Sequence, residues 1–405
     1  MVAGQWGPAP RNPRSAPAMS PANTMRSTSV LLRGAPTLAG WVAGWAATEL
    51  APEAVAGHAL SAVGHAGLHG LTHHWGGQRA GRVLTEALGA EFGEGFETQV
   101  RHPFEDHRPR HSVAGVWHAS QRRRRYAATT KEISYGPHCR DHRLDIWRSP
   151  ELPANGRAPV LLQIPGGAWA ISEKRGQAYP LMSRMVEHGW ICVAINYSRS
   201  PFSAWPAHIT DVKRAIAWVR ENIADYGGDP DFIALTGGSA GGHLASLAAL
   251  TADDLSLQPG FENVDTRVAA AVPYYGAYDL TDPSNMCTLM MPFLEQFVMH
   301  ARIADRPELF HQASPIHRVH RDAPPFFVLH GSHDAVIPRG QAAAFVDALR
   351  SAGASTVVHA DLPNAHHAFD VLGTLRSQLT ASAVASFLGI TYARHLASGE
   401  VRQAV

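Results

Sequence analysis

The chain has 405 residues, of which 45% are hydrophobic and 17% charged, so it is long enough to bury one large domain with an extension. Its formal net charge of +1 excludes an overall attraction to nucleic acid or to an acidic surface. Three cysteines without paired spacing argue against a disulfide framework and a zinc site, and the 24 histidines are interpreted as solvated or helix-face residues, with a metal cluster as the alternative.

The first part of the chain is biased in composition. Residues 1–27 are rich in Pro, Ala, Ser and Asn with little apolar periodicity, so we expect them to be disordered. The apolar segment 35–48 ends at Glu49 after about 14 residues, fewer than the roughly 20 that span a bilayer. It is therefore interpreted as a buried or interfacial helix. We expect the protein in the cytoplasm, with the periphery of a membrane or the cell envelope as the alternative.

Residues 28–130 are predicted to form a helical extension or cap. Apolar residues recur with helical spacing between Pro52 and Leu88, which indicates a helical pair. Glycines in this stretch cost up to about 1 kcal/mol each relative to alanine, so the helices must form by packing on another element. Three roles stay open: a cap over an active site, a membrane-touching surface, or a brace on the main domain. The basic run 122–125 is interpreted as a solvated linker, with contact to an anionic membrane or partner as the alternative.

The main domain is predicted over residues 131–392, with 393–405 as a C-terminal tail. Apolar runs typical of doubly covered strands alternate with helical stretches, which indicates an α/β fold with a mostly parallel sheet and helices on both faces. In such sheets ligands bind at the carboxyl ends of the strands. The predicted strands are 143–148, 159–164, 190–195, 232–235, 268–274, 326–329 and 356–359, and the predicted helices are 177–187, 209–226, 239–250, 339–352 and 371–388.

A glycine-flanked serine lies between one of these strands and the helix after it, in the sequence Gly237-Gly238-Ser239-Ala240-Gly241. A serine on such a sharp turn exposes its hydroxyl, while the glycines let the strand and helix approach closely. The pattern predicts Ser239 as a catalytic nucleophile.

A second small-residue loop, Pro165 to Trp169, follows the strand expected beside the nucleophile strand. Backbone N–H groups of Gly166, Gly167 and Ala168, together with that of Ala240, are predicted to form an oxyanion hole. A plain Pro-Gly-Gly turn is the alternative interpretation of the loop.

A serine nucleophile needs a base and an orienting carboxylate. Asp334 lies in a turn after the predicted strand 326–329, and His367 lies in a loop before the last helix, so we predict them as acid and base. The competing acids are Asp279, Asp361 and Asp370, and the competing bases are His366, His330 and His333.

These motifs, in this order, resemble those of the bacterial hormone-sensitive-lipase-like carboxylesterases of the α/β-hydrolase superfamily. The resemblance runs from about Leu144 to Leu388 and leaves the first 120 or so residues uncovered. It rests on Gly237 to Gly242, on the Pro165 to Trp169 loop where the family has His-Gly-Gly-Gly-Trp, on Asn196-Tyr197 through Pro201, on Trp205-Pro206-Ala207 with Asp211, on Tyr226 to Pro230, on Asp334, and on His367-Ala368-Phe369 where the family has His-Gly-Phe. Pro165 and Ala168 depart from the family pattern, as do Ser198 to Ser200 and Phe202, which bear on the support of the loop.

The resemblance implies an α/β-hydrolase fold and a serine carboxylesterase that acts on short- to medium-chain acyl esters through an acyl-enzyme, without metal or organic cofactor. An amidase, a formamidase or an acyltransferase with the same triad is the alternative, followed by a hydrolase-fold protein that only binds a ligand. The expected partner is a small-molecule acyl ester and not nucleic acid, with peripheral membrane contact through the extension kept open; the sequence predicts no oligomeric state. The insertion that holds Met286, Met290, Met291, Phe293, Phe297 and Met299 is either an acyl pocket or a plain core helix.

Overall fold

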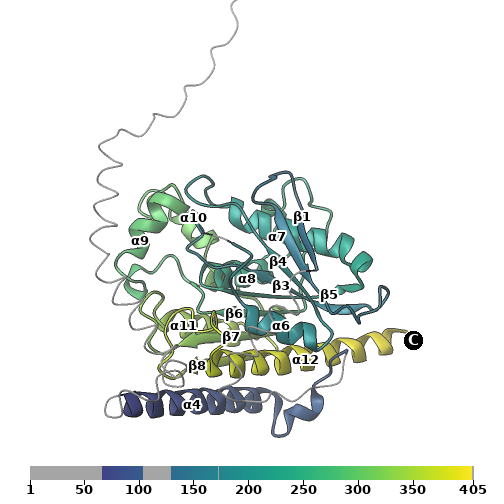
Figure 1. Cartoon of the computed structure of the whole chain (residues 1–405). Helices are drawn as coiled ribbons and strands as arrows, with labels where there is room; N and C mark the ends of the chain where they lie inside the picture. Colours follow the sequence, from purple (N-terminus) through teal and green to yellow (C-terminus); the bar gives the residue numbers. More distant parts are fainter. Residues whose placement is uncertain (1–65, 104–128, 172, 404–405) are drawn as a thin grey trace, which may run out of the picture. The chain divides into compact units, whose positions relative to one another are not determined.

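The computed structural model describes residues 66–103, 129–171 and 173–403 (Figure 1). The predictions for residues 1–27, 35–48 and 122–125 lie outside the described residues. Within the described ranges, no helix is both long and apolar enough to cross a membrane.

An eight-stranded sheet in the order β1-β2-β4-β3-β5-β6-β7-β8 forms the centre of the molecule. β2 pairs antiparallel with both β1 and β4, while the six strands β3 to β8 run parallel to one another. The predicted mostly parallel α/β fold is confirmed. Each predicted strand forms, and β1 adds an edge strand that the sequence did not indicate. The strands are β1 Thr130–Ser134, β2 Arg143–Trp147, β3 Ala158–Ile164, β4 Ile191–Ile195, β5 Gly228–Gly238, β6 Ala270–Tyr274, β7 Phe326–Gly331 and β8 Val357–Leu362.

Helices cover both faces of the sheet (Figure 1). Successive residues of β3 alternate between two hydrophobic clusters, as the strand period requires: Leu162 packs in the cluster of α7, α8 and α11, and Leu161 in that of α4, α6 and α12. The helices are α4 Ala66–Phe92, α6 Tyr179–Glu187, α7 Ala207–Asn222, α8 Ala240–Leu250, α9 Met290–Phe293, α10 Pro307–Gln312, α11 Gly340–Ser351 and α12 Leu375–Gln403. Shorter helical turns are η1 Phe96–Gln99, η2 Ile223–Tyr226, η3 Leu255–Leu257, η4 Pro283–Asn285, the π-helical η5 Leu294–Val298 and η6 Pro315–Arg318.

The described part of the extension packs as a brace. From Ala66 onward it is one continuous helix, α4, which contacts α12 and β8. Ala80, Leu84 and Leu88 recur every four residues and are buried in this contact. Figure 1 shows α4 lying along α12 on the same side of the sheet. A helix in this position supports the sheet from the face opposite α8.

The last helix differs from its prediction at both ends. It begins at Leu375 instead of 371 and continues through residues 393–403, which were predicted as a tail. The continuation has a packing reason, because Tyr392 and His395 on one face of α12 both contact the buried ring of Phe232, with ring centroids 5.2 and 5.0 Å away.

Candidate active site

Ser239 occupies a strained turn between β5 and α8. Its backbone angles, φ 57° and ψ −123°, are ones that non-glycine residues rarely adopt and that cost about 1–3 kcal/mol. The turn is held on both sides: the Ser239 N–H donates to the Tyr274 carbonyl at 3.0 Å, and the Ser239 carbonyl accepts from the His243 N–H at 2.9 Å. The strain therefore persists at the carboxyl end of β5, where parallel sheets bind their ligands.

The flanking glycines are required by close backbone contacts. A Cβ atom on Gly237 would lie 2.6 Å from the Gly241 backbone, and one on Gly241 would lie 2.1 Å from the Ile164 carbonyl oxygen. A Cβ atom on Gly238 would lie 2.6 Å from the Tyr275 hydroxyl. Strand, helix and neighbouring loop thus meet at the serine more closely than any side chain would permit.

The predicted acid and base contact each other directly. His367 Nδ1 donates to Asp334 Oδ2 at 2.7 Å, and the Asp334 side chain is fully buried. Asp334 Oδ1 accepts the backbone N–H groups of Val336 and Ile337 at 2.8 and 2.9 Å. Burial alone would raise the pKa of Asp334, but the imidazole of His367 and the Ile337 N–H hold this pKa below its usual value. A charged carboxylate beneath His367 orients the ring and would stabilise an imidazolium.

The competing acids have other partners. Asp279 accepts the N–H and hydroxyl of Thr281, and Asp361 lies 3.3 Å from Arg339. Asp370 accepts the hydroxyl of Tyr275.

The competing bases are placed less well. His366 packs against His333, with ring centroids 6.0 Å apart, and among the described residues its Nδ1 has no hydrogen-bond partner. His330 Nε2 lies 2.9 Å from the Ile337 carbonyl and 3.5 Å from Asp334 Oδ2, so it lies behind the carboxylate in a fully buried position. His367 is the histidine that the structure joins to Asp334 by a short hydrogen bond.

The Pro165 to Trp169 loop lies against the serine turn. β3 pairs with β5 so that Ile164 is opposite Gly237, and both segments leave the sheet at the same edge. A Cβ atom on Gly166 would lie 2.5 Å from the Gly238 carbonyl oxygen. Gly167 has φ 121° and Ala168 φ 51°, so the backbone turns sharply after Gly166. This contact places the small residues of the loop beside Ser239.

One of the predicted oxyanion donors has a side-chain partner in the structure. The Gly166 N–H donates to Gln177 Oε1 at 2.8 Å, so it is already engaged and is not available to a substrate. Neither the Gly167 nor the Ala240 N–H makes a hydrogen bond within the described parts of the chain. Ala240 is the first residue of α8, where backbone N–H groups have no intrahelical acceptor. The remaining candidates are Gly167, Ala168 and Ala240.

The two ends of the loop are anchored by hydrogen bonds from the segment after β4. The Tyr197 hydroxyl donates to the Pro165 carbonyl at 2.9 Å, and the Ser200 N–H donates to the Trp169 carbonyl at 2.9 Å. Trp169 Nε1 donates to His243 Nδ1 at 3.2 Å. Burial lowers the pKa of His243 to about 4, so the ring is neutral and its Nε2 donates to the Ala313 carbonyl at 2.7 Å. The hydrogen bonds from Tyr197 and Ser200 are accepted by backbone carbonyls. They are therefore still possible with Pro165 in place of the family's histidine.

Tyr275 joins the serine turn to the histidine loop. Its ring centroid lies 4.6 Å from that of His367, and its hydroxyl donates to Asp370. Burial raises the pKa of Tyr275 well above its ordinary value and also raises the pKa of Asp370. Sequence reasoning did not find Tyr275, Gln177 or His243 as site residues. Tyr275 directly follows a predicted strand, and His243 is four residues after Ser239 on the same helix, whereas nothing in the sequence marks Gln177.

The methionine-rich insertion packs partly against the core. Met299 is buried, while Met286, Met290, Met291 and Phe293 are partly buried against the core cluster of α7 and α8. This packing favours the core interpretation of these residues. The Trp205 N–H donates to the Val298 carbonyl at 2.9 Å, which ties the insertion to the loop after β4.

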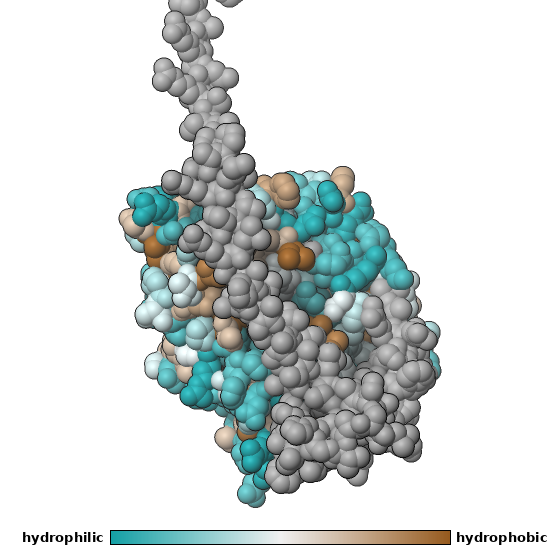
Figure 2. Space-filling view, turned by 60° about the vertical axis from the view of Figure 1, so that its left-hand side comes forward, coloured by the Kyte–Doolittle hydropathy of each residue, from teal (hydrophilic) through white to brown (hydrophobic). Residues whose placement is uncertain are grey.

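Some apolar side chains remain exposed near the site. Ile171, just beyond the Pro165 to Trp169 loop, is 75% exposed, and Phe202, in the loop after β4, is 94% exposed. On the side of the molecule that carries α9, hydrophobic residues reach the surface in several groups (Figure 2). Exposed apolar side chains in the loops after β3 and β4 suit an apolar substrate portion.

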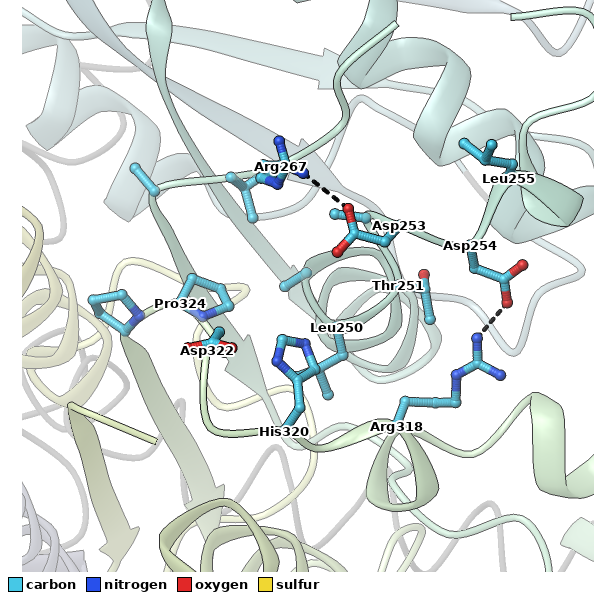
Figure 3. A pocket seen from close by; sticks show the side chains of 15 residues that line it. Leu250, Thr251, Asp253, Asp254, Leu255, Arg267, Arg318, His320, Asp322 and Pro324 are labelled. Carbon is cyan, nitrogen blue, oxygen red and sulfur yellow. Dashed lines mark hydrogen bonds and ion pairs between the residues drawn. The ribbon is translucent and has the colours of Figure 1, made fainter. Parts of the chain in front are cut away.

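A separate pocket lies at the other end of the strands (Figure 3). It is lined by the end of α8 and by Ala269 and Pro325, which directly precede β6 and β7. Both of its arginines form ion pairs, Arg267 with Asp253 and Arg318 with Asp254. The pocket therefore lies at the amino ends of the strands, away from Ser239, and its arginines are already engaged by carboxylates.

Comparison with known proteins agrees with this geometry. A family model described as BD-FAE matches residues 144–349. Esterase LipQ of Mycobacterium tuberculosis is 57% identical over 377 residues, which cover 92% of this chain and 90% of LipQ. The probable carboxylic ester hydrolase LipM of the same organism is 56% identical over 275 residues, covering 68% of this chain and 64% of LipM.

Solved structures give the same fold. Esterase 2 of Thermogutta terrifontis, phosphonylated by sarin, superposes with a TM-score of 0.56 at 23% identity, over 65% of this chain and 94% of that one. The predicted resemblance is confirmed: the chain belongs to the BD-FAE family, among the hormone-sensitive-lipase-like carboxylic ester hydrolases of the α/β-hydrolase superfamily.

Proposed function

We propose that the protein hydrolyses short- to medium-chain acyl esters through a triad of Ser239, His367 and Asp334 and an acyl-enzyme intermediate. The observation that carries this proposal is the 2.7 Å hydrogen bond from His367 to the buried Asp334. It fixes the hydrogen on Nδ1, so the other ring nitrogen is left as a proton acceptor. The strained turn holds Ser239 at the carboxyl edge of the sheet, and Tyr275 contacts both the turn and the His367 ring.

The first half of the reaction forms the acyl-enzyme. Ser239 Oγ attacks the ester carbonyl carbon while His367 Nε2 takes the hydroxyl proton, and the carbonyl π electrons move to the oxygen. The resulting oxyanion receives hydrogen bonds from the backbone N–H groups of Gly167, Ala168 and Ala240. When the C–O bond to the leaving alcohol breaks, His367 returns the proton to that alcohol.

The second half repeats these steps with water. His367 takes a proton from the water as its oxygen attacks the acyl carbon, and the proton then returns to Ser239 Oγ as the carboxylic acid leaves. Asp334 stays ionised throughout and stabilises the imidazolium in both halves. Its lowered pKa supports this role at neutral pH.

The apolar surface near the site supports an apolar acyl chain. Ile171 is three residues after Ala168, and Phe202 is two residues after Ser200, whose N–H donates to the Trp169 carbonyl. A chain of a few methylene groups gains about 0.8 kcal/mol for each group that such a surface buries. We therefore expect activity to rise from acetate towards butyrate and hexanoate esters.

The test is hydrolysis of p-nitrophenyl esters from acetate to palmitate by the wild type, by Ser239→Ala and by the control Ser246→Ala. Ser246 lies on the same helix, and its hydroxyl only donates to the Gly242 carbonyl at 2.9 Å. We expect activity in the wild type and the control, with the loss of at least three orders of magnitude in Ser239→Ala. A folded wild type that is inert on every ester but cleaves an aryl formamide would contradict the ester assignment.

A further inference from the structure

The oxyanion loop is held by one side chain that no motif marks. We propose that Gln177 is a positioning residue that sets the direction of the Gly167 N–H through two hydrogen bonds to the backbone of Gly166. This inference rests on the proposed function, because it assigns a role within the same acyl-transfer site.

Gln177 makes two hydrogen bonds to the backbone of Gly166. Gln177 Oε1 accepts the Gly166 N–H at 2.8 Å, and Gln177 Nε2 donates to the Gly166 carbonyl at 3.2 Å. A primary amide presents its acceptor and its donor on one edge, so it matches the N–H and C=O of a single residue. Both polar groups of Gly166 are thereby satisfied by one side chain, and rotation of either one breaks a bond.

The second bond orients the next N–H. The Gly166 carbonyl and the Gly167 N–H belong to the same peptide unit, which is planar and trans, so they point in opposite directions. Because Gln177 holds the carbonyl on its own side, the Gly167 N–H must point away from Gln177. The Gly167 N–H is also without a hydrogen bond among the described residues.

Gly166 also lies against the serine turn. A Cβ atom on Gly166 would lie 2.5 Å from the Gly238 carbonyl oxygen and 3.4 Å from Gln177 Oε1. Gly166 therefore lies close to both Gln177 and the residue that precedes Ser239. In this proposal the Gly167 N–H, which points away from Gln177, is directed at the oxyanion of a substrate held at Ser239.

The other anchors do not fix this peptide unit. The bonds from Tyr197 and Ser200 hold Pro165 and Trp169, at the two ends of the loop. Gly166 and Gly167 lie between them and have no side chains that resist a change of backbone angles. Without Gln177, the unit between them is free to rotate and to present the carbonyl of Gly166 to the site in place of the N–H of Gly167.

Gln177 is itself held in place. It lies two residues before the start of α6, where the Gly176 N–H donates to the Tyr179 hydroxyl at 2.9 Å. The Tyr179 ring packs on Trp147, with centroids 5.3 Å apart. The amide is therefore mounted on the start of a packed helix, as a positioning group requires.

The experiment compares Gln177→Glu, Gln177→Met and the control Gln99→Met in the full chain. Glutamate keeps an acceptor for the Gly166 N–H but replaces the donor to the Gly166 carbonyl by a repelling oxygen, while methionine removes both bonds at similar volume. Gln99 is exposed and its amide only donates to the Phe92 carbonyl. For each variant we measure kcat and KM on p-nitrophenyl butyrate, inhibition by an alkyl boronic acid, and the melting temperature.

We expect kcat to fall about 10- to 100-fold in both Gln177 variants, somewhat less than the 10²- to 10³-fold loss typical when an oxyanion donor is removed. KM should change by less than about threefold, because the oxyanion forms after substrate binding. The boronic acid binds Ser239 as a tetrahedral anion, so its inhibition constant should rise by the same factor as kcat falls. The Gln99 variant should match the wild type in all these measurements.

Unchanged kcat and unchanged boronate inhibition in both folded Gln177 variants would overturn the inference. A lower melting temperature with unchanged kcat per titrated active site would do the same, since it would show a merely structural role. The failure of the proposed function looks different: the wild type would be inert on esters, or Ser239→Ala would stay active. An active, Ser239-dependent enzyme whose Gln177 variants behave normally would refute only the role of Gln177.

Discussion

Replacing Asp334 by asparagine should invert the hydrogen placement on His367. Asparagine has one oxygen, and the backbone N–H groups of Val336 and Ile337, which now donate to Oδ1 at 2.8 and 2.9 Å, require that oxygen. The side-chain NH₂ group must therefore face His367. Its Nδ1 then has to act as an acceptor, so the neutral ring carries its hydrogen on Nε2 and can no longer take the proton of Ser239.

The expected loss is large because the two backbone donors oppose a flip of the amide. A histidine held in the wrong tautomer loses on the order of 10⁴-fold in kcat, which corresponds to about 5.4 kcal/mol in the barrier. KM should change little, since substrate binding does not require the proton transfer. Steady-state kinetics on p-nitrophenyl butyrate, with circular dichroism to confirm folding, measures the effect.

Asp279→Asn and Asp361→Asn serve as matched controls, because both carboxylates were candidates and both have other partners. We expect each control to retain kcat within about threefold. If folded Asp334→Asn kept more than a tenth of the wild-type kcat, or if Asp361→Asn lost as much as Asp334→Asn, the assignment of Asp334 as the orienting acid would be wrong.

Three further predictions concern stability. Gly241→Ala places a Cβ atom 2.1 Å from the Ile164 carbonyl oxygen, so it should lower the free energy of unfolding by about 3 kcal/mol and abolish activity. Gly89→Ala, on a helix with no neighbour within 4 Å, should raise the free energy of unfolding by about 0.5–1 kcal/mol. Urea titrations measure both changes, and equal effects would contradict the steric argument. Burial raises the pKa of Asp370, so its contribution to stability is present below the pKa of the unfolded chain and is lost as the pH rises through the pKa of the folded chain. Asp370→Asn should therefore gain stability relative to the wild type as the pH is raised from about 4 to about 8. A difference in the free energy of unfolding that stays constant with pH would refute this. Burial lowers the pKa of His243 from 6.5 to about 4, so as the pH falls the unfolded chain binds a proton before the folded chain does. The free energy of unfolding of the wild type should therefore decrease by about 3 kcal/mol between pH 6.5 and pH 4. This pH dependence should be smaller in His243→Gln.

Strand and helix order could be predicted because each element carries its own local signal. The strand 159–164 is unbroken and apolar, and the structure buries every residue of β3 from Ala158 to Ile164. β1 was missed because its pattern of exposed and partly buried residues resembles a loop, and only its pairing with β2 defines it. The end of α12 was missed because the contact of His395 with Phe232 is a tertiary one.

The candidate site could be predicted only as far as chain order carries information. Turn residues at strand ends pointed to Ser239, Asp334 and His367, and the structure joins the last two. The sequence could not tell Gly166 from Gly167, because adjacent glycines in a loop differ only in what surrounds them. The difference depends on a side chain eleven residues away, Gln177, whose reach is set by how α6 packs on the sheet.

One turn of α8 links the groups that must act together. Ser239 precedes the helix, Ala240 begins it, and His243 lies one turn later and accepts a hydrogen bond from Trp169 at the end of the oxyanion loop. A rigid helical turn therefore fixes nucleophile, one oxyanion donor and the loop anchor at constant separation. The acid and base come from separate loops after β7 and β8, so their position relative to the nucleophile depends on Tyr275, which contacts both sides. Substitutions of Ala240 or His243, in the first turn of α8, should consequently disturb oxyanion stabilisation, whereas substitutions at Tyr275 should disturb proton transfer. Profiles of kcat against pH distinguish the two.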